Sequence, residues 1–174
     1  MAYIIITTHP DGGEEYVKSA SRYPTNEDSV LAKGYGVTAN DPVVTEMQFN
    51  KTARYWNNQN KNQFIHLTFS FETQEAPDAH TAMEITDNAL DSFKDDHLML
   101  VGIHGKENEK SDFHSHSFIH TTNYRDGSMI YADNNTLFPV AQSVADQTGE
   151  KCVLVKKKEN NMKKEFRKTF YPHK

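Results

Sequence analysis

Residues 98–122 read LMLVGIHGKENEKSDFHSHSFIHTT and contain two apolar segments separated by a charged one. The apolar run at 98–103 predicts a buried strand, the charged GKENEKSD at 105–112 predicts a loop, and residues 113–122 predict a second strand. Two strands joined in this way form a hairpin. We therefore expect a β-hairpin that the rest of the chain packs around.

Three of the nine histidines are expected to meet on this hairpin. Side chains two apart on a strand share a face and lie about 6.6 Å apart, so His114 and His116 point the same way. His104, at the end of the partner strand, can come opposite them. His120 shares their face but lies roughly 13 Å beyond His116, too far for the same ion. We expect it to be a substrate contact or a surface histidine.

Three imidazoles with no thiolate do not make a closed structural zinc site. A metal with open coordination positions acts as a Lewis acid or activates a bound water. The alternative is that HSH at 114–116 is only an exposed polar strand. The residues alone thus indicate a metal-assisted phosphoryl or hydrolytic site and name no substrate.

Composition limits the class of protein. The chain has 174 residues, enough for one domain with a full core. Its single cysteine, Cys152, excludes an intrachain disulfide, and the start of the chain has no signal-peptide pattern and no apolar run long enough for a membrane span. We predict a soluble, cytoplasmic protein with no membrane partner.

The charge is unevenly distributed. The net charge is −5, yet residues 151–174 contain nine Lys or Arg against two acids. A basic end on an acidic body indicates a segment that contacts nucleic acid, or a solvated helix surface.

Periodicity and turn residues place the other elements. Strands are predicted at 2–9, 63–72, 128–132 and 151–156, helices at 14–23, 41–56, from 78 onward and at 137–149, and an ordered loop at 24–39. Strands and helices do not alternate strictly, so a doubly wound parallel sheet is not favoured. An α+β fold with a mainly antiparallel sheet and helices packed on one face fits better, leaving the other face for a ligand.

Residues 103–130, IHGKENEKSDFHSHSFIHTTNYRDGSMI, resemble the third motif of conjugative relaxases, the HUH endonucleases of plasmid mobilisation, in the MobA/VirD2 branch. FIHLTFSF at 64–71 and GYGVTANDPVVTEM at 34–47 are similar to two earlier stretches of that family, in the same order. The resemblance implies a relaxase/Rep-like fold. It also implies a nicking domain at 1–156, followed by a basic C-terminal tail or final helix at 157–174.

The resemblance implies that His104, His114 and His116 hold a divalent cation, Mg²⁺ or Mn²⁺ with Zn²⁺ as the alternative. The cation would act on the scissile phosphate of single-stranded DNA at an origin of transfer. A tyrosine would attack this phosphate and leave a 5′-phosphotyrosine bond, so that the strand is nicked and later rejoined. Other relaxosome proteins and a type IV secretion system are the implied partners.

The nucleophile departs from the family pattern, because an ungapped comparison places Ser19 where the tyrosine is expected. Tyr16 and Tyr23 lie on the same face of the predicted helix. We favour Tyr23, since RYPTNED resembles the family's tyrosine followed by a polar turn, and keep Tyr16 as the second candidate. The alternatives are a rolling-circle initiator or single-strand transposase of the same chemistry, or a non-catalytic DNA-binding accessory protein.

A relaxase also needs contacts to single-stranded DNA, which are aromatic platforms and cations along the backbone. We expect Tyr35 to stack on a base and Arg125, Lys156 and Lys157 to meet phosphates, with His120 as a further contact. Packing within the protein explains the aromatic residues equally well.

Overall fold

The hairpin forms within a seven-stranded sheet. The computed structural model describes residues 1–7, 9, 13–105, 112–156 and 165–174. In it the strand order is β2-β4-β5-β3-β1-β6-β7. The strands are β1 (Ala2–Thr7), β2 (Ser29–Tyr35), β3 (Phe64–Ser70), β4 (His97–His104), β5 (His114–Asn123), β6 (Cys152–Lys156) and β7 (Phe166–Phe170). Every neighbouring pair is antiparallel except β1 and β6, so the predicted α+β class with a mainly antiparallel sheet is confirmed.

The helices are α1 (Glu14–Arg22), α2 (Pro42–Tyr55), α3 (Ala79–Ala89) and α4 (Asn134–Thr148), with short 3₁₀ turns η1 (Tyr23–Thr25) and η2 (Asp91–Phe93). Three of the four α-helices in the described ranges begin at an aspartate side-chain cap, whereas α1 begins after Gly13 without one. Asp41, Asp78 and Asp133 each accept backbone N–H bonds at the start of α2, α3 and α4. Gly149, with φ of 68°, ends α4 in the left-handed conformation.

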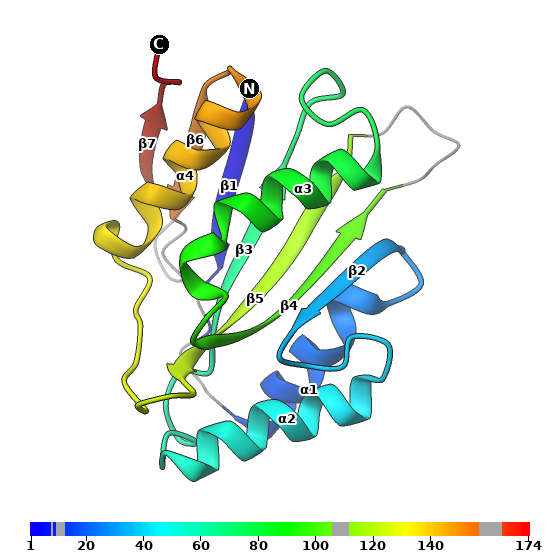
Figure 1. Cartoon of the computed structure of the whole chain (residues 1–174), viewed down its shortest axis with the longest axis vertical. Coiled ribbons are helices and arrows are strands. Elements are labelled where there is room, and N and C mark those ends of the chain that lie inside the picture. Colours follow the sequence, from blue (N-terminus) through cyan, green and yellow to red (C-terminus); the bar gives the residue numbers. More distant parts are fainter. Residues whose placement is uncertain (8, 10–12, 106–111, 157–164) are drawn as a thin grey trace.

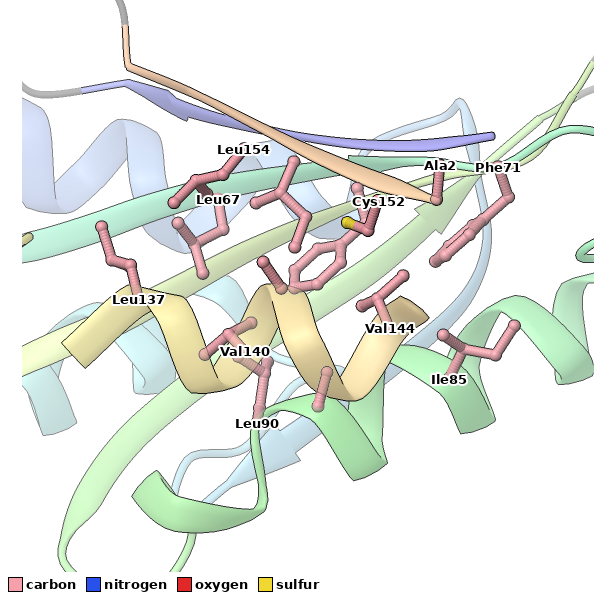
Figure 2. Packing of buried hydrophobic residues seen from close by; sticks show 14 of the residues in the cluster. Ala2, Leu67, Phe71, Ile85, Leu90, Leu137, Val140, Val144, Cys152 and Leu154 are labelled. Atoms are coloured by element: carbon pink, nitrogen blue, oxygen red, sulfur yellow. The ribbon is translucent and has the colours of Figure 1, made fainter. Parts of the chain in front are cut away.

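One face of the sheet packs against α3 and α4 (Figure 1). Leu137, Val140 and Val144 of α4 point toward the strands, where they meet residues such as Leu67 and Leu154 (Figure 2). This large core also takes every second residue of β4, namely Met99, Val101 and Ile103. Because strand side chains alternate, the residues between them face the other way.

The opposite face packs against α1 and α2 through a second, smaller core. Its residues are Val17, Ala20, Phe49, Phe64, Leu98, Leu100 and Phe118. Helices therefore cover both faces, and the expectation that they pack on one face holds for α3 and α4 only. His104, His114 and His116 lie on the α1/α2 face, next to the turn η1 that follows α1.

Three segments differ from their predictions. Residues 24–39, expected to be a loop, contain η1 and the edge strand β2, which pairs with β4. The strand expected at 128–132 is reduced to one bridge between Thr122 and Met129. The tail or helix expected at 157–174 is wrong for Phe166–Phe170, which form β7 against β6. Residues 157–164 and most of the hairpin loop, 106–111, lie outside the described residues.

Within the described ranges, no helix combines the length and the apolar character that crossing a bilayer requires.

Candidate active site

The three predicted histidines meet at one end of the β4–β5 hairpin. His104 pairs with His114 across the two strands, and His116 pairs with Gly102. One ring nitrogen from each of the three imidazoles lies within 4.8 Å of the others, so the triad could hold a metal ion. His104 and His116 are buried and His114 is half-buried. The prediction that these three side chains converge is confirmed.

Hydrogen bonds orient two of the three rings. Nε2 of His104 lies 3.2 Å from the carbonyl oxygen of Pro24, and because a carbonyl only accepts, this nitrogen carries the proton. Nδ1 of His116 lies 3.3 Å from Nε2 of His66 and 3.4 Å from Oγ1 of Thr68. Such partners fix ring orientation, as outer hydrogen bonds do for metal-binding histidines. His66 thus acts as a hydrogen-bonded residue of β3 beside the triad.

The electrostatics of the triad favour metal binding. Burial and then, in decreasing order, the imidazoles of His104, His66 and His114 together lower the pKa of His116 to about 3. Burial and then His104 also lower the pKa of His114. A metal binds the neutral imidazole, so both rings are in the binding form at neutral pH. A set of three nitrogen donors suits transition metals.

Tyr23 lies directly beside the triad. It is the first residue of η1, and its Oη is 3.5 Å from Nε2 of His116. Its ring centroid lies 4.7 Å from that of His116 and 5.4 Å from that of His104. The side chain is 43% exposed, so a ligand can reach it. Ser19, one turn earlier on α1, is exposed, and its carbonyl accepts the backbone N–H of Tyr23.

Tyr16 lies in the smaller core instead. Its ring packs edge-on against Phe64 and Phe118, at centroid distances of 5.5 and 6.5 Å. Its Oη is buried and has no hydrogen-bond partner among the described residues. Burial raises the pKa of Tyr16 well above its usual range, which keeps the phenol protonated. Of the two candidate tyrosines, only Tyr23 is brought to the triad.

The expected DNA contacts do not gather at the triad. The hydroxyl of Tyr35 donates to Asp87 of α3, on the far face of the sheet. Lys156 is also on that face, where its Nζ donates to Asn134 at the start of α4. Arg125 follows the opposite end of β5 and donates to the carbonyl of Asp95. Lys157 lies outside the described residues.

His120 is not available to DNA, and the expectation of a surface contact is wrong. Its side chain is fully buried, with Phe49 of α2 and Phe64 of β3 packed against the ring. Its Nε2 lies 3.3 Å from Oε1 of Gln63. Strand periodicity placed it correctly on the histidine face, but α2 covers that end of the face.

A cavity of about 290 Å³ opens beside His114. Tyr3 of β1 and Ser70 of β3 line one side, and Glu72 and Asp112 line another. The local sequence does not single out Tyr3 as a residue of the site. The order β5-β3-β1 brings it there, and this pairing of distant strands is not evident from the local sequence.

A comparison with protein families identifies the family of this chain. The model of the MobA/VirD2-like relaxase nuclease domain matches residues 16–154. The chain belongs to this family. The predicted membership of the MobA/VirD2 type of relaxases is thereby confirmed.

Two solved structures of conjugative relaxase TrwC with oriT DNA, one metal-bound and one metal-free, are similar to this relaxase domain. They share 13% and 14% sequence identity with it, at a TM-score of 0.43 in each case. The matches cover 84% and 86% of this chain and 69% and 66% of the TrwC chains. No curated protein matches the sequence.

Proposed function

We propose that this relaxase domain nicks and rejoins one strand of DNA at an origin of transfer, with Tyr23 as the nucleophile. The observation that carries the proposal is the position of Tyr23 Oη, 3.5 Å from Nε2 of His116 in a triad suited to a metal. Tyr16, the second candidate, has its hydroxyl buried in the smaller core.

The chemical step is a transesterification at phosphorus. Tyr23 loses its phenolic proton and forms an Oη–P bond, while the bond from phosphorus to the 3′ oxygen breaks. The 3′ oxygen takes up a proton and leaves as a hydroxyl, so the downstream strand stays bound as a 5′-phosphotyrosine. One phosphodiester replaces another, and the step can run backward to rejoin the strand.

A phenol has a pKa of about 10 and is a weak nucleophile at neutral pH. A divalent cation at the triad supplies positive charge, which neutralises the phosphate and stabilises the charge that develops on it. Mg²⁺ and Mn²⁺ are the proposed ions. The all-imidazole set favours Mn²⁺, or the alternative Zn²⁺, over Mg²⁺, which prefers oxygen ligands.

The chain's own residues prepare this site in two ways. His66 and Thr68 hold the His116 ring from its Nδ1 side, which leaves Nε2 on the side of Tyr23. Pro24 holds His104 from the turn that carries Tyr23. The ligands and the nucleophile are thus held in one arrangement before substrate binds, which reduces the reorganisation needed for reaction.

The proposed substrate is single-stranded DNA at the origin of transfer, and relaxosome and secretion proteins are the proposed partners. A cytoplasmic location follows from this role. The placement of Tyr23 favours an active enzyme over a non-catalytic accessory protein, which the serine at position 19 would otherwise indicate. A replication initiator or transposase would use the same residues on a different DNA sequence.

The test is formation of a covalent adduct. Single-stranded oligonucleotides labelled at the 3′ end and tiling the DNA around the gene are incubated with the protein and Mn²⁺, then separated on a denaturing gel. We expect a labelled protein band that Tyr23→Phe abolishes and Tyr16→Phe retains. An adduct formed by a Ser19→Tyr variant, with none from the wild-type protein, would show that the natural chain is not an active nickase. If the labelled product comes from replication-origin DNA only, the initiator alternative holds.

A further inference from the structure

The turn that carries Tyr23 touches the sheet at one glycine. A Cβ built on Gly102 would lie 1.7 Å from the carbonyl oxygen of Pro24. It would also lie 2.5 Å from the carbonyl carbon and 2.9 Å from the Cα of the same residue. All three are backbone atoms, which cannot rotate away as the end of a side chain can. Only glycine therefore allows η1 to sit at this distance from β4.

What Gly102 supplies is space and not an unusual backbone conformation. The glycines with positive φ among the described residues are Gly36, Gly127 and Gly149. Gly102 lies within β4, between strands β2 and β5, where any residue could adopt the backbone angles. The hydrophobic run at 98–103 has a glycine at the one position where another backbone approaches.

The contact lies between two metal-ligating candidates. Gly102 pairs with His116 on β5 and precedes His104 by two residues on β4, so all three share one face of the sheet. The same carbonyl that Gly102 admits accepts the hydrogen bond from Nε2 of His104. Tyr23 directly precedes this carbonyl's residue in η1.

We propose that Gly102 is a positioning residue for the nucleophile: it lets η1 seat against β4, and this seating sets the place of Tyr23 Oη beside His116. The inference rests on the proposed role of Tyr23. Gly102 touches neither DNA nor metal, and it acts through the Pro24 backbone.

The size of the effect follows from the geometry. To accept a Cβ at Gly102, the Pro24 oxygen must move from 1.7 Å to at least 3.0 Å from it. A shift of about 1 Å in a reacting group costs on the order of 100-fold in rate. Gly102→Ala is therefore expected to slow adduct formation by about 100-fold. The Pro24 carbonyl also accepts the hydrogen bond that orients His104, so moving it should weaken Mn²⁺ binding by about 10-fold as well. The rates are therefore compared at saturating Mn²⁺.

A second glycine offers a matched control. A Cβ on Gly34 of β2 would lie 2.2 Å from the carbonyl oxygen of Val37, again a backbone atom. Gly34→Ala thus introduces the same kind of conflict into the segment between β2 and α2, away from Tyr23. Any general loss of stability from such a clash should appear in both variants, while a loss of nucleophile positioning should appear in Gly102→Ala only.

The experiment compares wild type, Gly102→Ala and Gly34→Ala as full chains. Single-turnover adduct formation is measured at saturating oligonucleotide with Mn²⁺, together with the oligonucleotide Kd and the Mn²⁺ Kd. Metal-free NMR then reports the cross-peak between the Tyr23 and His116 rings, whose centroids are 4.7 Å apart. We expect Gly102→Ala to lose the cross-peak and about 100-fold in rate at saturating Mn²⁺. The oligonucleotide Kd should stay within a few-fold of wild type, and the Mn²⁺ Kd should rise about 10-fold.

A folded Gly102→Ala protein that keeps the ring cross-peak and the wild-type rate overturns the proposal. If the wild-type chain forms no adduct, the proposed nicking function fails, while the cross-peak comparison still decides how Tyr23 is positioned. If Gly102→Ala does not fold, the proposal is tested by NMR of the wild-type protein alone. Cross-peaks between the Hα atoms of Gly102 and Pro24 are then expected, and their absence overturns the proposal.

Discussion

The buried His120 makes the stability of this protein depend on pH in a way that one substitution should remove. Its side chain is fully buried, and its Nδ1 has no hydrogen-bond partner among the described residues. Burial, with a smaller contribution from the nearby His97, lowers its pKa to about 3. The native protein therefore keeps this imidazole neutral where the unfolded chain would protonate it.

The sign and size of the effect follow from this difference. Below the ordinary histidine pKa of about 6.5, the unfolded state binds a proton that the native state does not, so stability falls as the pH falls. The loss continues down to the folded pKa of about 3. At pH 4.5, two pH units below the unfolded value, the cost is about 3 kcal/mol relative to pH 7.

Urea unfolding at pH 7 and pH 4.5 in the presence of EDTA measures this loss without interference from bound metal. We expect the difference between the two pH values to be about 3 kcal/mol smaller for His120→Gln than for wild type. His80→Gln is the control, because His80 is exposed on α3. The reasoning is refuted if His120→Gln loses as much stability on acidification as the wild-type chain and the His80→Gln control.

Three further outcomes are expected. Tyr16→Phe should raise the free energy of unfolding by about 1 kcal/mol, since it removes a buried hydroxyl that has no hydrogen-bond partner among the described residues. A lower free energy of unfolding in a urea titration would contradict this. His66→Leu should weaken Mn²⁺ binding about 10-fold, because His116 loses an orienting contact, and an unchanged Kd in calorimetry would exclude that role. Phe170→Ala should destabilise the fold by about 3 kcal/mol, because Phe170 is buried, with 8% of its surface exposed. Phe166→Ala should cost far less, because Phe166 is 38% exposed. Equal losses of stability in thermal or urea unfolding would mean that Phe170 does not anchor β7.

The triad could be predicted because its spacing is local. A period of two fixes the common face of His114 and His116, and a hairpin brings His104 opposite. The same period assigned His120 to that face but could not show how deeply it lies. Its burial depends on Phe49 of α2, which is 71 residues earlier in the chain. Strand periodicity gives the face of a residue, and only tertiary packing decides what covers it.

Strand β2 could not be predicted for a different reason. Ser29–Tyr35 has one β-branched residue, Val30, and its last residues run into the Gly34-Tyr35-Gly36 segment that is typical of a loop. Pairing with β4 supplies its hydrogen bonds, and this pairing overrides a weak local propensity. The resemblance to relaxases favoured Tyr23 over Tyr16, but its placement depends on the close backbone contact at Gly102. A glycine within a buried strand was the available signal.

The position of β1 also determines the order in which this molecule can assemble. β1 lies between β3 and β6 in the sheet. One of its two edges can therefore pair only after β6 (Cys152–Lys156), far along the sequence, has been made. The hairpin with its three histidines joins segments close in the chain and can form early, whereas closing the long loop to β6 is slow. During synthesis the apolar edge of β1 stays open until β6 emerges, and a chain cut short before residue 152 would expose it as a template for aggregation.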